Sequence, residues 1–222
     1  MKFISQNLLI SLALLCANQA FAGDTKYIFF GGAQSDKATL DTCLPGSNFE
    51  RFAYPITSEE RTALLKEINL HPNTSYVLVG HSSGSASAIE IASDKKLKNR
   101  EHVSLVDLDG FSPREVPAPI RRVCWRAKNE KNLESRNYAV MTQENGCDEV
   151  HTQTATNCNT VWCLHFLLVN PSTPADLDES SMGESGYLGC TTKNLGWLDY
   201  EKNRRRIKNN HGARPVTDAE VK

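Results

Sequence analysis

The feature that most constrains the fold is a five-residue turn, from Gly80 to Gly84, that lies between a strand pattern and a helix pattern. Residues 76–79 (YVLV) are a short apolar run typical of a buried strand. Residues 85–93 (SASAIEIAS) are rich in small side chains, which allow a helix to pack closely on a sheet. Buried strands separated by helices favour a parallel sheet covered on both faces, so the segment predicts an α/β fold.

Similar strand patterns recur on both sides of this segment. We expect buried strands at residues 27–30 and 103–108, a strand nearer an edge at 49–54, and a further strand at 138–142. A helix is predicted at residues 59–68, because Thr57 and Glu60 have capping-box spacing before an apolar helical face. The sequence thus predicts a doubly wound, mostly parallel central sheet of about five strands flanked by helices.

Three other segments are assigned by composition. Residues 111–136 hold three of the nine prolines and a charged stretch, which predicts a surface excursion with at most one helix. Residues 171–182 are polar and contain proline, so we expect a loop, and residues 198–209 predict a charged, solvent-facing helix. There is no internal repeat and no linker, so residues 23–222 are predicted to form a single domain.

The first 22 residues have the pattern of an export signal. One positive charge at Lys2 precedes an apolar core at residues 8–17, and Ala20-Phe21-Ala22 is a small-x-small cleavage site. The apolar core is short for a membrane-spanning helix, and bulky leucines before Cys16 do not fit a lipoprotein signal. An uncleaved anchor is the alternative. We expect cleavage after Ala22 and a secreted or periplasmic protein.

Six cysteines follow the predicted cleavage site, namely Cys43, Cys124, Cys147, Cys158, Cys163 and Cys190. An even number in an exported chain predicts up to three disulfides, whose pairing the sequence leaves open. Metal binding is the alternative, but no second Cys/His pair accompanies Cys158 and Cys163 at zinc-ribbon spacing. We therefore expect a disulfide-stapled domain with no metal site.

The net charge of −1 excludes nucleic-acid binding through overall charge. Residues 202–208 hold a basic cluster, which we interpret as a charged helix face, with contact to anionic lipid at a membrane surface or to nucleic acid as the alternative. No phosphate loop, dinucleotide fingerprint or metal motif is present, so no cofactor is predicted.

The turn itself, Gly80-His81-Ser82-Ser83-Gly84, has the pattern G-x-S-x-G in its expected strand-turn-helix context. A turn this sharp holds Ser82 in a strained conformation with its hydroxyl above the sheet edge, and glycines at both ends avoid side-chain clashes. The N–H of Ser83 starts a helix and points to where an oxyanion would form. A Ser/Gly-rich loop without chemistry is the alternative.

Residues 27–166 with this motif resemble the α/β-hydrolase superfamily of serine esterases and lipases, and their small size and cysteine content look like its compact, lidless cutinase-like members. The resemblance implies an oxyanion donor in the loop after the first core strand. Here that donor is the N–H of Ala33 or Gln34, partnered by that of Ser83. It also implies triad partners in the order serine, acid, histidine.

The resemblance places the acid after the fifth predicted strand, where Asp148 lies beside Cys147, a residue that would clamp the loop. Competing carboxylates lie in the same loop, at Glu144 and Glu149, and at the end of the preceding strand, at Asp107 and Asp109.

For the histidine, the resemblance favours His165, which follows the acid and a cysteine-braced loop. The alternatives are His151, which is only three residues from Asp148, and His211, which lies in a charged tail. His165 also fits a core histidine, because residues 161–169 form one apolar run that is either a helix or a strand.

Together these features predict an exported serine hydrolase that cleaves carboxylic esters of a small-molecule or lipid substrate through an acyl-enzyme, with Ser82, His165 and Asp148 as the triad. An acyltransferase that uses the same serine and a non-catalytic binding protein of this fold are the alternatives.

Overall fold

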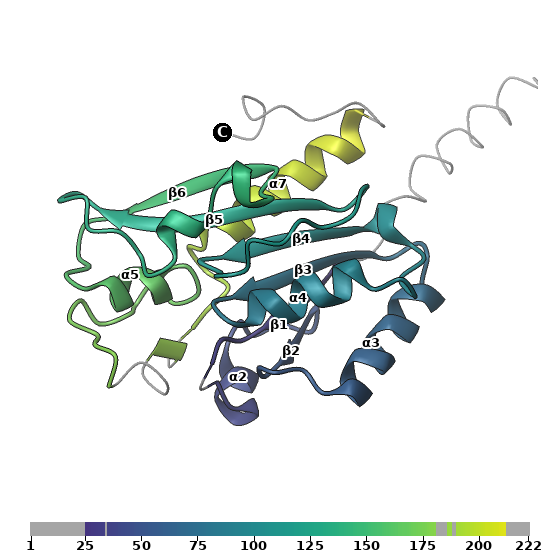
Figure 1. Ribbon diagram of the computed structural model, residues 1–222, viewed down its shortest axis with the longest axis horizontal. Helices are drawn as coiled ribbons and strands as arrows, with labels where there is room; N and C mark the ends of the chain where they lie inside the picture. The colour runs from purple at the N-terminus through teal and green to yellow at the C-terminus, as the bar shows by residue number, and fades with distance from the viewer. Residues whose placement is uncertain (1–24, 34, 181–185, 188–189, 212–222) are drawn as a thin grey trace, which may run out of the picture.

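The computed structural model describes residues 25–33, 35–180, 186–187 and 190–211, and its centre is a six-stranded sheet (Figure 1). The strands are β1 (Thr25–Phe30), β2 (Phe49–Phe52), β3 (Ser75–His81), β4 (Val103–Leu108), β5 (Arg121–Asn129) and β6 (Glu149–Ala155). Their order across the sheet is β2-β1-β3-β4-β5-β6, and every neighbouring pair is parallel. The predicted α/β class is confirmed, with six strands rather than about five.

Helices cover both faces of this sheet. The α-helices are α2 (Lys37–Thr42), α3 (Ser58–Leu70), α4 (Gly84–Ser93), α5 (Val161–Leu167) and α7 (Gly196–His211), and the 3-10 helices are η1 (Arg100–His102), η2 (Tyr138–Val140) and η3 (Gln143–Asn145). Residues alternate between two apolar cores along β1, with Tyr27 and Phe29 in one core and Ile28 and Phe30 in the other. One core contains side chains from α2, α5 and α7 and the other contains side chains from α3 and α4, which makes the sheet doubly wound.

The strongest sequence patterns give the observed elements. Strands β1, β3 and β4 lie within the sheet and are almost wholly buried, which explains their continuous apolar sequences. Strand β2 is at an edge, as predicted for residues 49–54. The capping box of Thr57 and Glu60 is present at the start of α3, and residues 161–167 form a helix rather than a strand.

Two predictions about the middle of the chain were wrong. Residues 138–142 contain the 3-10 helix η2 instead of a strand, and the predicted surface excursion at 111–136 contains β5. The sequence did not predict β5 because this strand is rich in polar residues, one of which, Arg122, is buried in an ion pair. The edge strand β6 (EVHTQTA) is also largely polar, so neither strand has a continuous apolar run.

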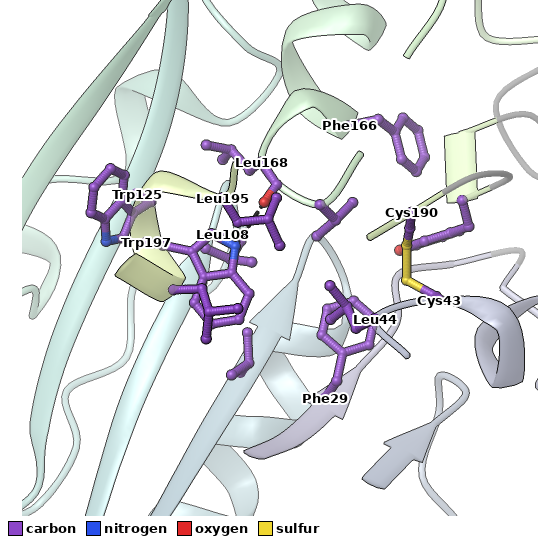
Figure 2. Packing of buried hydrophobic residues seen from close by; sticks show 14 of the residues in the cluster. Phe29, Cys43, Leu44, Leu108, Trp125, Phe166, Leu168, Cys190, Leu195 and Trp197 are labelled. Atoms are coloured by element: carbon purple, nitrogen blue, oxygen red, sulfur yellow. Dashed lines mark hydrogen bonds between the residues drawn. A yellow bond between two sulfur atoms is a disulfide. The ribbon is translucent and has the colours of Figure 1, made fainter. Parts of the chain in front are cut away.

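The C-terminal helix α7 is less solvent-facing than predicted. Trp197 near its start is fully buried and donates from Nε1 to the carbonyl oxygen of Leu168, and it packs among the side chains shown in Figure 2. Glu201 is also fully buried and pairs with Arg204, whose Nη2 lies 2.9 Å from Glu201 Oε2. Arg205 donates to the hydroxyl of Ser104 in β4. Part of the basic cluster therefore binds the protein itself.

All six cysteines form disulfides, pairing Cys43 with Cys190, Cys124 with Cys147, and Cys158 with Cys163. Three disulfides in a chain of this size are typical of a protein that folds in an oxidising compartment. The predicted signal at residues 1–22 lies outside the described residues. None of the helices in the described part of the chain is long and apolar enough to cross a membrane.

Candidate active site

The turn between β3 and α4 has the conformation that its sequence predicts. Ser82 has φ of +54°, in the left-handed region that residues with side chains rarely adopt. Its N–H donates to the carbonyl oxygen of Leu108, the last residue of β4, at 3.0 Å. A Cβ atom on Gly80 would overlap the backbone of Ser85, and one on Gly84 would overlap the carbonyl oxygen of Phe30. Both glycines are therefore required by close backbone packing around a strained serine.

His165 lies in α5, a short helix on the side of the sheet that carries Trp197. The Thr160 hydroxyl caps this helix by accepting from Cys163 N–H at 3.0 Å, and the disulfide to Cys158 constrains the same turn. The His165 side chain is 1% exposed, and its ring lies 4.5 Å from that of His81 between centroids. The histidine is therefore held by the capped, disulfide-braced helix and by packing against His81.

The carboxylate that contacts His165 is that of Asp109. Oδ2 of Asp109 lies 2.5 Å from Nδ1 of His165, and both side chains are buried. Because a carboxylate only accepts, Nδ1 carries the proton and Nε2 is left with a free lone pair. This tautomer suits a general base at Nε2.

Asp109 directly follows β4 and is itself in the left-handed region, with φ of +47°. Its Oδ1 accepts from the Ser135 hydroxyl at 2.6 Å, and its Oδ2 accepts from Asn137 N–H at 3.3 Å. The amide of Asn137 also donates to the Asp109 carbonyl oxygen at 2.6 Å. These bonds fix the direction of the carboxylate.

Asp148, the acid predicted from the sequence, is not brought to His165. Its exposed carboxylate accepts from the N–H of Arg122 at 2.7 Å, where β5 and β6 begin to pair. Residues 138–142 are not a strand, so the loop that contains Asp148 does not follow the fifth strand, as the prediction of this acid assumed. Cys147 does brace this loop, through Cys124.

The other candidates are also placed elsewhere. Glu149 lies in β6 and contacts His151, whose ring stacks on Trp125. Glu144 lies in η3, on the surface. His211 is the last residue of α7, and its side chain lies outside the described part.

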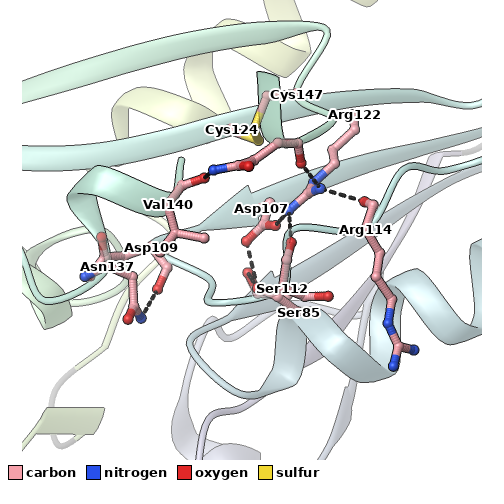
Figure 3. Close-up of polar contacts among 12 residues, drawn as sticks. Ser85, Asp107, Asp109, Ser112, Arg114, Arg122, Cys124, Asn137, Val140 and Cys147 are labelled. Carbon is pink, nitrogen blue, oxygen red and sulfur yellow. Dashed lines mark hydrogen bonds and ion pairs between the residues drawn. A yellow bond between two sulfur atoms is a disulfide. The ribbon is translucent and has the colours of Figure 1, made fainter. Parts of the chain in front are cut away.

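Asp107, two residues before Asp109, belongs to a buried ion pair (Figure 3). Arg122 Nη2 lies 2.6 Å from Asp107 Oδ2, and the Ser85 hydroxyl donates to Oδ1 at 2.5 Å. The guanidinium also donates to backbone carbonyl oxygens, those of Ser112, Arg114 and Asn145. Burial raises the pKa of Asp107, against the opposing effect of Arg122. The pair therefore joins β4 and β5 to the loops that contain these carbonyl groups.

Ser82 and His165 line the same small cavity, of about 120 Å³, although no hydrogen bond joins these two described side chains. Ser83 and Ala33, two of the predicted oxyanion donors, line it as well, while Gln34 lies outside the described residues. Arg136 lies at the same cavity, with its guanidinium stacked over Trp162 at 4.5 Å. In the described part of the chain, no group of three or more His, Cys, Asp or Glu residues is arranged to hold a metal ion.

A second, larger groove of about 830 Å³ lies between α3 and α4. Charged side chains such as Arg61, Glu90 and Asp94 line it, and it shares no residue with the Ser82 cavity. Of these two cavities, the smaller one is the candidate site, because it is lined by the strained Ser82 and by His165, whose buried partner is Asp109.

Sequence reasoning missed one residue of the site. The Tyr187 hydroxyl accepts from Gly32 N–H at 2.5 Å and lies 2.7 Å from Nδ1 of His81. No motif marks Tyr187, because it is 106 positions from its histidine partner.

No family model matches the sequence, and no curated protein matches it. Among solved structures, the chain is similar to a protein named as a YdeN-like hydrolase from Pectobacterium atrosepticum, with 13% identity, a TM-score of 0.40 and coverage of 66% of this chain and 83% of that one. A type II thioesterase of the yersiniabactin pathway has 9% identity and a TM-score of 0.41, over 61% of this chain and 85% of the thioesterase. A cutinase-like protein from Cryptococcus sp. has 10% identity and a TM-score of 0.34, over 77% and 90%. These similarities are too distant to place any residue, so the assignment of the site depends on its geometry.

Proposed function

We propose that this chain is an exported serine hydrolase that cleaves carboxylic esters through an acyl-enzyme. Ser82 is the nucleophile, His165 the general base and Asp109 the acid that orients His165. The observation that carries the proposal is the buried 2.5 Å hydrogen bond between His165 and Asp109, at the cavity that Ser82 lines from its strained turn.

In the first step, Nε2 of His165 accepts the hydroxyl proton of Ser82 as Oγ attacks the ester carbonyl carbon. The imidazolium that forms is stabilised by the Asp109 carboxylate, which stays ionised. His165 then gives the proton to the departing alcohol, leaving an ester on Ser82. Water, activated by the same Nε2, releases the acid and restores the serine.

The oxyanion formed in each step needs N–H donors. We assign this role to the backbone N–H groups of Ser83 and Ala33, which both border the cavity, with Gln34 as the alternative next along the loop. In the backbone hydrogen-bond pattern of the described residues, neither Ser83 nor Ala33 donates to another group. One such donor contributes about 3–4 kcal/mol to transition-state stabilisation in comparable sites.

The size of the cavity favours a small acyl group. Its volume of about 120 Å³ has room for about four groups the size of a water molecule. We therefore expect short-chain esters, of about two to four carbons in the acyl part, to react faster than long-chain ones.

Export is part of the proposal because two independent features support it. The disulfides favour an oxidising compartment, and the first 22 residues have the pattern of a cleaved signal. The protein is then secreted or periplasmic.

The test is labelling of the oxidised protein with a fluorophosphonate, followed by peptide mass mapping. An activated serine reacts readily with this probe, so we expect modification at Ser82 that is lost in Ser82→Ala and His165→Ala. The same proteins are then assayed on p-nitrophenyl esters of increasing chain length. Release of the free acid without an added alcohol distinguishes hydrolysis from acyl transfer. A folded protein that neither labels nor cleaves any ester would favour a non-catalytic binding protein.

A further inference from the structure

We propose that Tyr187 and His81 are positioning residues that hold the Gly32 loop, residues 31–33, in the orientation that the oxyanion requires. The inference rests on the proposed function and deepens it. It assigns a task to two fully buried polar side chains near Ser82 that the mechanism above does not use.

A chain of hydrogen bonds joins four segments that are far apart in the sequence. Gly32 N–H donates to the Tyr187 hydroxyl oxygen at 2.5 Å, and this hydroxyl lies 2.7 Å from Nδ1 of His81. Nε2 of His81 lies 3.0 Å from the carbonyl oxygen of His165. Tyr187 and His81 are both fully buried. Direct hydrogen bonds therefore connect the Gly32 loop, the Tyr187 segment, the serine turn and the helix that carries His165.

The direction of each proton in this chain is fixed by chemistry. The His165 carbonyl oxygen only accepts, so Nε2 of His81 must carry a proton. A neutral imidazole then has its lone pair at Nδ1, which accepts from the Tyr187 hydroxyl. The lone pairs of that hydroxyl oxygen in turn accept from Gly32 N–H. Every polar hydrogen has one acceptor, and reversal of any bond would leave two donors or two acceptors facing each other.

The surroundings keep this arrangement in one protonation state. Burial, with a smaller contribution from the neighbouring His165, lowers the pKa of His81 well below its usual value. Burial also raises the pKa of Tyr187. The Tyr187 ring packs edge-on against the rings of Phe29 and Phe166, with centroids 6.5 and 5.1 Å away. A neutral, tightly packed pair can serve as a fixed support but not as a proton carrier.

The position of Gly32 shows why such a support matters. A Cβ on Gly32 would lie 2.9 Å from Ser82 Cβ and 3.0 Å from the Tyr187 hydroxyl oxygen. The loop therefore passes directly between the nucleophile and the tyrosine. Because Gly32 N–H is occupied by Tyr187, it is not available to a substrate oxygen, which leaves the next N–H, that of the cavity-lining Ala33, as the donor that we assign. Tyr187 thus determines which loop N–H is the oxyanion donor.

The main test removes the Tyr187 hydroxyl with Tyr187→Phe, which keeps the ring packing. We expect kcat on p-nitrophenyl acetate to fall about 10-fold with KM unchanged, less than the loss of a whole oxyanion donor. The inhibition constant of butylboronic acid, which forms a tetrahedral adduct with an activated serine, should rise by a similar factor. Tyr76→Phe is the matched control. It deletes a buried tyrosine hydroxyl near the other end of β3, five residues and about 17 Å from His81, and should change neither value.

Two variants of His81 distinguish an effect on the orientation of Tyr187 from an effect on folding. In His81→Asn, Oδ1 replaces Nδ1 as the acceptor for Tyr187, so the boronate inhibition constant should stay within about 3-fold of wild type. In His81→Gln, the donor to the His165 carbonyl is kept but the acceptor for Tyr187 is lost, so the constant should rise as in Tyr187→Phe. If Tyr187→Phe does not fold, the comparison between these two variants decides.

The inference is overturned if Tyr187→Phe retains kcat within 2-fold, or if it loses thermal stability while the boronate constant is unchanged. Equal effects of His81→Asn and His81→Gln on that constant would also overturn it. Failure of the proposed function looks different, because wild type and Tyr76→Phe would then neither label with fluorophosphonate nor cleave the ester.

Discussion

Replacement of Asp109 by asparagine tests the proposed triad most directly, because the structure and the sequence favour different acids. The left-handed backbone at Asp109 tolerates asparagine, and the two side chains have the same shape. In the native site, Oδ2 accepts from His165 Nδ1 and from Asn137 N–H, while Oδ1 accepts from the Ser135 hydroxyl. An amide oxygen placed at Oδ2 keeps the first two bonds, and its NH₂ group then donates to the Ser135 hydroxyl oxygen.

This orientation determines the size of the effect. The reverse orientation would place the NH₂ group against the Asn137 N–H and would force the wrong tautomer on His165, a change that costs about 10⁴-fold in a related triad. In the favoured orientation the tautomer is kept, and only the charge on the hydrogen bond is lost. A bond to a charged group contributes about 1.5–3 kcal/mol, so kcat should fall by about 10- to 150-fold, with KM unchanged.

The assay is steady-state hydrolysis of p-nitrophenyl acetate, with Asp148→Asn as the matched control. Asp148 is exposed, and an amide oxygen can still accept from Arg122 N–H, so this variant should remain within 2-fold of wild type. The reasoning would be refuted if Asp109→Asn kept full kcat. A loss of kcat in Asp148→Asn instead would favour Asp148, the acid predicted from the sequence. Far-UV circular dichroism of both variants shows whether the fold is unchanged.

Three further predictions concern stability, each measured by urea unfolding. Replacing Cys43 and Cys190 by serine should cost about 3–5 kcal/mol, because this disulfide joins residues 147 positions apart, and a loss under 1 kcal/mol would contradict the loop-entropy argument. Arg122→Met should cost about 3–5 kcal/mol by leaving the buried Asp107 carboxylate without its cation, and adding Asp107→Asn should recover part of that loss. Burial lowers the pKa of His81, so below about pH 6.5 the unfolded chain binds a proton that the folded chain does not. The free energy of unfolding therefore falls as the pH falls, by up to about 1.4 kcal/mol per pH unit. His81→Gln should remove this contribution, and an unchanged pH slope would show that His81 is not neutral in the fold.

The sequence predicts those parts of the fold in which a local physical constraint restricts the residue types that fit. Strands β3 and β4 are buried on both faces, so their sequences are continuously apolar. The turn at Ser82 needs glycines where the backbone approaches Phe30 and Ser85, and those glycines are visible as a motif. Local patterns were sufficient here because the constraint is local.

The acid predicted from the sequence and the acid proposed from the structure differ because one strand was not predicted. Strand β5 begins with two arginines, and the second is accommodated in the sheet only because Asp107 of β4 neutralises it. A buried ion pair between separate strands has no periodicity, so β5 appears in the sequence as a surface segment. Without that strand, residues 138–142 are counted as the fifth strand and Asp148 is predicted as the acid, whereas we propose Asp109. Asp109 was visible as the end of β4, but its selection depends on Ser135 and Asn137, which fold back onto it from 26 and 28 residues away.

Tyr187 could not be predicted either, because its hydrogen-bond partners are far away in the sequence. A disulfide explains how its segment is held near them. The Tyr187 carbonyl oxygen accepts from Cys190 N–H at 3.1 Å, and Cys190 is bonded to Cys43, which ends the helix α2 that follows the Gly32 loop. The covalent bond therefore holds the Tyr187 segment beside that loop before any hydrogen bond to Gly32 is considered. The Cys158–Cys163 bond acts in the same way at the helix that carries His165. Two of the three crosslinks therefore lie next to the proposed site, where they constrain the segments that carry Tyr187 and His165.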